Sequence, residues 1–248
     1  MHTLNVESQL VMMNMYQILL STGNFGITLD TGAEIIEPVD HEKMLGCQIS
    51  SDFTWNEHIR DNEFSMQRML TSRINALKKI SFGVSFKMRK MVANSIVISR
   101  MIYIIQLWGG TSEYLLKSLQ VLQNKTARTV TRLGWFTPQS VLLRQCGWLS
   151  IKQLVEYHSL ILLFKVKNVG KPVYLHKIAS RKFPFETRAS TANNIVENQH
   201  TSRDTTKQGF VHRSSKSWNF LSIKIKLETK LLKFKQMLRT WILENVPP

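Results

Sequence analysis

The chain has 248 residues, of which 43% are hydrophobic and 20% charged, and its formal net charge at pH 7 is +16. These values suit a folded protein, because they allow one large domain or two small ones with a buried core. The positive excess indicates an anionic partner, either nucleic acid or an acidic membrane surface.

The two cysteines, Cys47 and Cys146, exclude a disulfide scaffold, and two thiols cannot form a zinc knuckle by themselves. We expect both thiols to be reduced and buried. The apolar stretch 10–20 lacks a cationic flank and a small-residue cleavage site, so it is a poor signal peptide. The sequence therefore predicts an intracellular protein of the nucleus or cytoplasm, not secreted and without a membrane partner.

Charge is divided unevenly along the chain. Residues 1–60 contain 2 basic and 8 acidic residues, a balance of −6, whereas residues 61–248 contain 31 basic and 9 acidic residues, a balance of +22. The surface for a polyanion is therefore expected after residue 60.

The first 60 residues are predicted to hold the strands of the protein. Residues 1–20 are Met-rich and are expected to be helical, but Phe25, Ile27 and Leu29 then alternate and precede a turn at 30–32. This pattern resembles a hairpin, and 43–49 follows as a further short apolar strand.

From residue 61 the apolar residues recur at helical spacing. This spacing predicts helices over 62–80, 86–107 and 113–133, and Gly83 and Gly109 end the first two. Short glycine-bearing turns join these helices into a compact three-helix bundle over 61–135. The helix over 113–133 is the most clearly amphipathic. We expect its apolar face to close the bundle and its cationic face to point toward a nucleic-acid backbone: Lys117, Lys125, Arg128 and Arg132.

A further helical region is predicted over 136–248. Thr137 and Pro138 are typical of a helix start, and Ser150 and Gly170 delimit a helix over 151–169. Residues 180–217 are expected to be irregular, and 227–246 to form a basic closing helix. The predicted fold is mainly α with a small N-terminal β part (α+β), in three parts: 1–60, 61–135 and 136–248.

No catalytic constellation is evident. Nucleotidyl transfer needs carboxylates clustered around two metal ions about 4 Å apart, but the five aspartates are all isolated in sequence: Asp30, Asp40, Asp52, Asp61 and Asp204. There is no glycine-rich phosphate loop, no histidine pair at metal-ligand spacing and no nucleophile elbow. His158 is more typical of a core residue than of a base. Trp135, in a loop beside basic residues, is a candidate for base stacking, although a structural role is favoured even there. We expect no catalytic residue and no bound metal.

An ordered series of short motifs carries a family resemblance. The motifs are KMLG at 43–46, FTWNEHI at 53–59, LTSRINAL at 70–77, LQVLQNKTAR at 119–128, GWLS at 147–150, YHSL at 157–160 and SWN at 217–219. In order and spacing they resemble the C-terminal part of a reverse transcriptase from a non-LTR, jockey-like retrotransposon.

The resemblance implies a role for each part. Residues 43–49 resemble the hairpin at the end of the palm that helps to hold the primer end. Residues 61–133 resemble the thumb, which grips the template–primer duplex, and 137–248 resemble the region after it. The palm strands with the catalytic aspartates lie upstream in the family. RNA-directed DNA polymerase activity is therefore not carried over, and Mg²⁺ is expected only for the full-length polymerase.

Phosphate contacts from Lys and Arg give affinity without reading sequence. The candidates for such contacts are Lys43, Arg68, Arg73, Lys78, Lys79, Lys87, Arg89, Lys90, Lys125, Arg128 and Arg132. Three hypotheses fit: a truncated reverse transcriptase limited to template–primer binding, a free-standing basic helical nucleic-acid-binding module, or an inert product of a decayed element. DNA, RNA and their hybrid all remain possible partners, as does the missing upstream polymerase part.

Overall fold

A computed structural model describes residues 29–30, 35–36, 41–50, 54–173, 175–176 and 209–247. The chain divides into two compact units, Met1–Met69 and Leu70–Pro248, and each is considered by itself. The helix expected over 1–20 lies outside the described residues. The three-part division expected from the sequence stays a prediction.

The first unit contains two antiparallel hairpins. Strands β1 (Leu29–Asp30) and β2 (Ile35–Ile36) form one, and β3 (His41–Met44) and β4 (Cys47–Ser50) form the other. The β3–β4 turn is tight because Leu45 and Gly46 both take positive φ. A π-helical turn, η1 (Glu57–Asp61), packs next to β4 and brings buried His58 against the Cys47 thiol.

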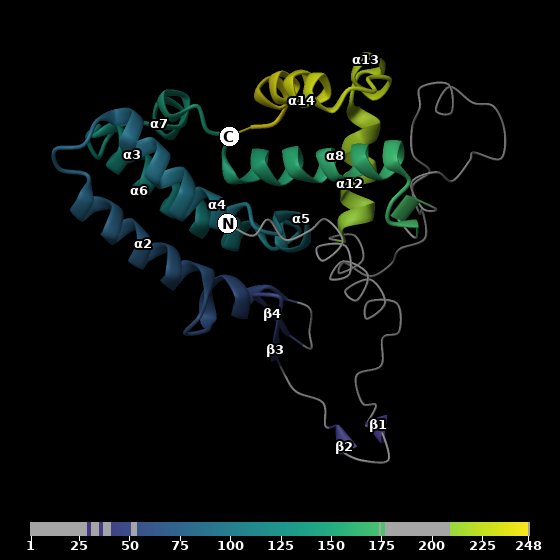
Figure 1. Ribbon diagram of the computed structural model, residues 1–248, viewed down its shortest axis with the longest axis horizontal. Coiled ribbons are helices and arrows are strands. Elements are labelled where there is room, and N and C mark those ends of the chain that lie inside the picture. Colours follow the sequence, from purple (N-terminus) through teal and green to yellow (C-terminus); the bar gives the residue numbers. More distant parts are fainter. Residues whose placement is uncertain are drawn as a thin grey trace. The chain divides into compact units, whose positions relative to one another are not determined.

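Four helices meet around one apolar cluster in the second unit. They are α2 (Met66–Ile80), α3 (Phe86–Ala93), α6 (Glu113–Thr131) and α7 (Gln139–Cys146), and they lie together in blue to teal in Figure 1. The cluster is built from buried side chains of all four: Leu77, Ala93, Ala127, Val130, Leu142 and Cys146. The three predicted helices thus share a core, to which α7 contributes a fourth helix. Removing this much apolar surface from water is the main stabilising contribution.

The helix expected over 86–107 is broken. It runs as α3, the π-helical turn η2 (Asn94–Ile98), α4 (Ser99–Met101) and α5 (Ile105–Trp108), with Ile104 left-handed at φ 44°. A β-branched residue in this conformation is strained. Ile104 and Trp108 are both buried, and the Trp108 indole donates to the Tyr103 carbonyl. The periodicity of the sequence favours a continuous helix, but the burial of Ile104 and Trp108 stabilises the broken form more.

Helix α8 (Ile151–Val169) matches its predicted bounds. Ser150 and Gln153 form a reciprocal capping box at its start, and Gly170 ends it in a left-handed conformation. Its apolar length packs against α5, α12 (Phe210–Phe220) and α14 (Leu231–Asn245), as Figure 1 shows. Phe234 stacks on Phe164 at 4.1 Å between ring centroids.

Two boundaries near the C-terminus differ from the sequence prediction. Residues 210–217, expected to be irregular, form the first part of α12, because buried Phe210 and Trp218 anchor one face of a helix. The closing helix begins at Leu231 rather than Leu227, after the short α13 (Ile223–Lys226). Residues 180–208 lie outside the described part. The fold is mainly α with a small N-terminal β part, and none of the described helices is long and apolar enough to cross a membrane.

Candidate nucleic-acid interface

Two of the predicted phosphate-binding residues lie in the first unit. Lys43 is exposed on β3, and its ammonium lies 5.6 Å from the centroid of the Phe64 ring. Arg68 is exposed on the first turn of α2. The other nine candidates belong to the second unit.

The ends of α2, α3 and α6 are tied together by two arginines. Arg132, which follows the last residue of α6, donates from Nη2 to the Ser81 carbonyl after α2 at 2.7 Å. Arg89 in α3 donates from Nε to the Val130 carbonyl of α6 at 2.8 Å, and from Nη1 to the Val84 carbonyl. The C-terminal ends of α2 and α6 therefore meet the N-terminal end of α3.

This meeting point gathers cationic side chains, and we call it the basic end of the bundle. Its accessible members are exposed or half-buried: Lys78, Lys79, Lys87, Lys90, Lys125, Arg128 and Arg132. In the described residues no ion pair reaches Lys78, Lys79, Lys87 or Lys125.

Acidic residues are almost absent from this part of the sequence. Between residues 64 and 155 Glu113 is the single carboxylate, and it lies at the start of α6, the opposite end of that helix. It accepts a 2.8 Å contact from Lys152 and lies 3.6 Å from Lys117. The Lys152 hydrogen bond, followed by the charges of both lysines, lowers the Glu113 pKa. Glu113 is therefore paired at the start of α6, away from the basic end.

The helix dipole distinguishes the cations that stabilise their own helix from those that do not. Lys78 and Lys79 lie in the last turn of α2 and Arg128 in the last turn of α6, where cations favour the helix dipole. Lys87 is exposed in the first turn of α3, which has no acidic residue. A cation at a helix N-terminus opposes the dipole, so helix stability does not explain Lys87.

One predicted contact residue has an internal role in the structure. Arg89 is only 7% exposed, and its guanidinium donates to backbone carbonyls that tie the helices together, so it is the candidate least accessible to a phosphate. Burial, and next the charge of Arg132, lower the Arg89 pKa. Arg73 is half-buried and donates to the Ile96 carbonyl at 2.8 Å, which ties α2 to η2.

Two tight turns at the basic end carry exposed aromatic side chains. In the turn Ser81–Val84 the Val84 N–H donates to the Ser81 carbonyl, and Phe82 is 84% exposed. In the turn Gly134–Thr137 the Thr137 N–H donates to the Gly134 carbonyl, and Trp135 and Phe136 are 69% and 96% exposed. The sequence pointed to Trp135 alone. The sequence does hold a signal for Phe82 and Phe136. Each is an aromatic residue in a short loop that also contains a glycine, and basic residues lie close by in the sequence.

The buried Cys146 and His158 side chains of the second unit have shifted pKa values. Burial raises the pKa of the Cys146 thiol to about 11, opposed by the Lys90 charge. Burial, with the charges of Lys235 and Lys165, lowers the pKa of His158 to about 4. Both groups are therefore neutral at pH 7. The described residues contain no cluster of three or more His, Cys, Asp or Glu side chains that could hold a metal ion.

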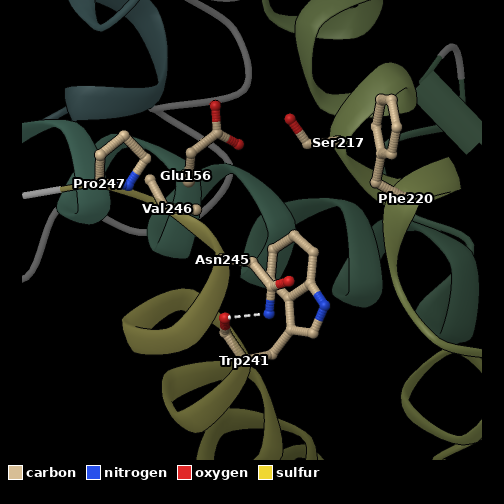
Figure 2. A pocket seen from close by; sticks show the side chains of 7 residues that line it. All are labelled: Glu156, Ser217, Phe220, Trp241, Asn245, Val246 and Pro247. Carbon is tan, nitrogen blue, oxygen red and sulfur yellow. Dashed lines mark hydrogen bonds between the residues drawn. The ribbon is translucent and has the colours of Figure 1, made fainter.

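A hollow of about 370 Å³ lies between α8, α12 and the end of α14 (Figure 2). It is lined by Glu156, Ser217, Phe220, Trp241, Asn245, Val246 and Pro247. In this lining Glu156 is the single ionisable side chain, and the Asn245 amide is bonded to the Trp241 carbonyl at 2.8 Å. This composition provides no acid–base pair.

Comparison with known proteins finds one informative relative. The chain is 25% identical over 124 residues to a probable RNA-directed DNA polymerase from transposon X-element of Drosophila melanogaster. The chain is therefore similar, over part of its length, to a transposon RNA-directed DNA polymerase. The similar part covers 47% of this chain and 13% of that protein, so the relationship concerns a limited section of the polymerase. No family model and no solved structure matches the chain.

Proposed function

We propose that this chain is the palm-end, thumb and following region of a jockey-like, non-LTR reverse transcriptase, and that it binds the template–primer duplex without catalysing polymerisation itself. One observation carries the proposal. The second unit brings cations from three helices to the basic end while Glu113, the single carboxylate of residues 64–155, lies at the far end of α6.

The binding mode follows from the chemistry of these side chains. Exposed lysines on helix ends offer charge but no fixed donor pattern, which suits phosphates and not base edges. Binding should therefore be independent of sequence and strongly weakened by salt, because each neutralised phosphate releases condensed counterions. We assign the catalytic aspartates and the Mg²⁺ that they hold to the upstream part of the polymerase. We also expect the protein to act inside the cell.

A charge-reversal series tests the duplex contact. The triple variant Lys79→Glu, Lys87→Glu, Lys125→Glu changes exposed residues and spares both bridging arginines. We expect its affinity for a duplex to fall. The slope of log affinity against log salt should flatten by about 1 for each phosphate that the variant no longer neutralises. Fluorescence anisotropy over a salt series measures both.

The matched control is Lys216→Glu, Lys224→Glu, Lys230→Glu. These three lysines are also exposed but lie on or beside α12, α13 and α14, and the change in net charge is the same. Equal weakening in the two triple variants would show a general charge effect and contradict a defined interface. Primer extension with Mg²⁺ or Mn²⁺ tests the other half of the proposal, and any incorporation by this chain alone would contradict it.

A further inference from the structure

Hydrogen bonds tie the two turns at the basic end to each other. The first turn begins at Ser81, whose carbonyl accepts the 2.7 Å hydrogen bond from Arg132. The second turn begins at Gly134, two residues after Arg132. The Arg89 guanidinium also bonds Val84, the last residue of the first turn, and Val130 near the end of α6. The relative placement of the two turns is therefore set by three hydrogen bonds.

Each turn holds its aromatic residue at a corner. Phe82 takes the second position of its turn, followed by Gly83 at φ 75°, the conformation that a type II turn requires at its third position. Trp135 and Phe136 occupy the second and third positions of the other turn. Turn corners normally carry Gly, Pro, Asn, Asp or Ser. Aromatic side chains here leave most of their apolar surface in water and gain little fold stability from burial, which favours a binding role.

Positive charge next to the exposed aromatic rings indicates which class of partner fits them. The Arg128 guanidinium lies 5.0 Å from the centroid of the Trp135 ring, and the Trp135 side chain still keeps most of its surface exposed. Lys79, Lys87 and Lys125 add exposed positive charge nearby on α2, α3 and α6. Flat rings next to cations match a chain in which flat bases alternate with phosphates, and every nucleobase has a face that can stack.

We propose that Phe82, Trp135 and Phe136 form a stacking site for unpaired nucleobases, so that this end of the bundle holds a single-stranded nucleic-acid segment beside the duplex. The inference rests on the proposed function for the phosphate contacts, and it adds a second ligand class, unpaired bases, at the same end. Duplex bases are stacked on each other and closed to these rings, whereas a single strand or an overhang presents them.

The test compares the full chain with the triple variant Phe82→Ser, Trp135→Ser, Phe136→Ser. All three side chains are largely exposed, so the variant should fold, which its thermal transition checks. The probes are a single strand of about 12 nucleotides, an abasic strand with the same phosphates, and a blunt duplex. Phe220→Ser is the control, since Phe220 is an exposed aromatic residue on α12, 71% accessible.

The variant should bind the single strand about tenfold or more weakly than the parent protein, bind the duplex within about twofold, and keep the same salt slope. The parent protein should bind the abasic strand about as weakly as the variant binds the normal strand, and Phe220→Ser should change neither affinity.

Equal single-strand affinity in the parent and the variant would overturn the stacking site, while salt-dependent duplex binding would leave the proposed function standing. Loss of salt-dependent duplex binding, with aromatic-dependent strand binding retained, would overturn only the phosphate contact. Aromatic-dependent binding to vesicles of anionic lipid, with no preference for normal over abasic strands, would assign these residues to a membrane surface and overturn the inference.

Discussion

At the scale of single residues, identical charges have different roles according to where their side chains end. Lys87 and Arg89 are two residues apart in α3, but Lys87 is exposed to solvent and Arg89 is buried between two backbone carbonyls. Sequence patterns place both on a basic segment and cannot tell which one is used internally. The phosphate contact proposed for Lys87 and the structural role of Arg89 are therefore separable by experiment.

The first prediction separates them. Arg89→Met removes a buried guanidinium and leaves the Val130 and Val84 carbonyls without their hydrogen-bond donor. The free energy of unfolding should therefore fall by about 2–3 kcal/mol. Lys87→Met should change it by less than about 0.5 kcal/mol. Urea denaturation followed by circular dichroism measures both, and equal stabilities of the two variants would contradict the role assigned to Arg89.

His158 gives a pH-dependent prediction. Its folded-state pKa of about 4 lies below the ordinary value of 6.5, because burial and the charges of Lys235 and Lys165 disfavour the imidazolium. Between pH 6.5 and about 4 the unfolded chain therefore binds a proton that the folded chain does not, and stability falls as pH falls through this window. The stability removed in this way is roughly 3 kcal/mol at pH 4.

The variant His158→Gln cannot titrate in this range. Relative to the parent protein it should gain stability progressively from pH 6.5 to 4, as measured by urea unfolding at each pH. A difference between the two proteins that stays constant with pH would refute the lowered pKa of His158.

At the scale of elements, close packing of α5 on α8 depends on a missing side chain. A Cβ atom at Gly109 would lie 2.7 Å from the Cγ1 atom of Val155 and would also meet the Ile105 carbonyl. Gly109 is buried, so Val155 cannot move away without disturbing α8, and the Ile105 carbonyl cannot move without disturbing α5 itself. The sequence predicts Gly109 as a helix stop, but the contact with α8 is decided by tertiary packing.

A glycine pair tests this contact. Gly109→Ala should lower the unfolding free energy by about 1–3 kcal/mol through overpacking. Gly134→Ala is the control, because a Cβ atom there meets nothing within 4 Å and the residue has no positive φ. Thermal unfolding of both variants measures the effect, and a Gly109→Ala protein as stable as the Gly134→Ala protein would argue against close α5–α8 packing.

At the scale of the whole molecule, the net charge of +16 destabilises the folded chain through self-repulsion. Added salt screens this repulsion between exposed charges, since the Debye length falls to about 10 Å at 0.1 M. We therefore expect the midpoint of thermal unfolding to rise between about 0.05 and 0.5 M NaCl, and a short duplex at low salt to raise it as well. Differential scanning fluorimetry follows both, and a midpoint that falls with salt would show that net attraction, not repulsion, governs the folded charges.

The sequence by itself determined the mainly helical class, the bounds of α8 and the location of positive charge after residue 60. These are local properties: apolar spacing, the Ser150 and Gly170 signals, and the count of ionisable residues. The same local spacing led to a continuous helix over 86–107, where burial of Ile104 and Trp108 breaks it instead.

Only the tertiary structure decided how the basic end is composed. Phe82 and Trp135 are 53 positions apart, and they lie at one end of the bundle because Arg132 donates to the Ser81 carbonyl, 51 positions before it. The same folding buried Arg89 and left Lys87 exposed. Sequence spacing reports which residues share a helix face, but contacts between helices depend on how those faces pack, and that packing separates a structural arginine from a candidate ligand.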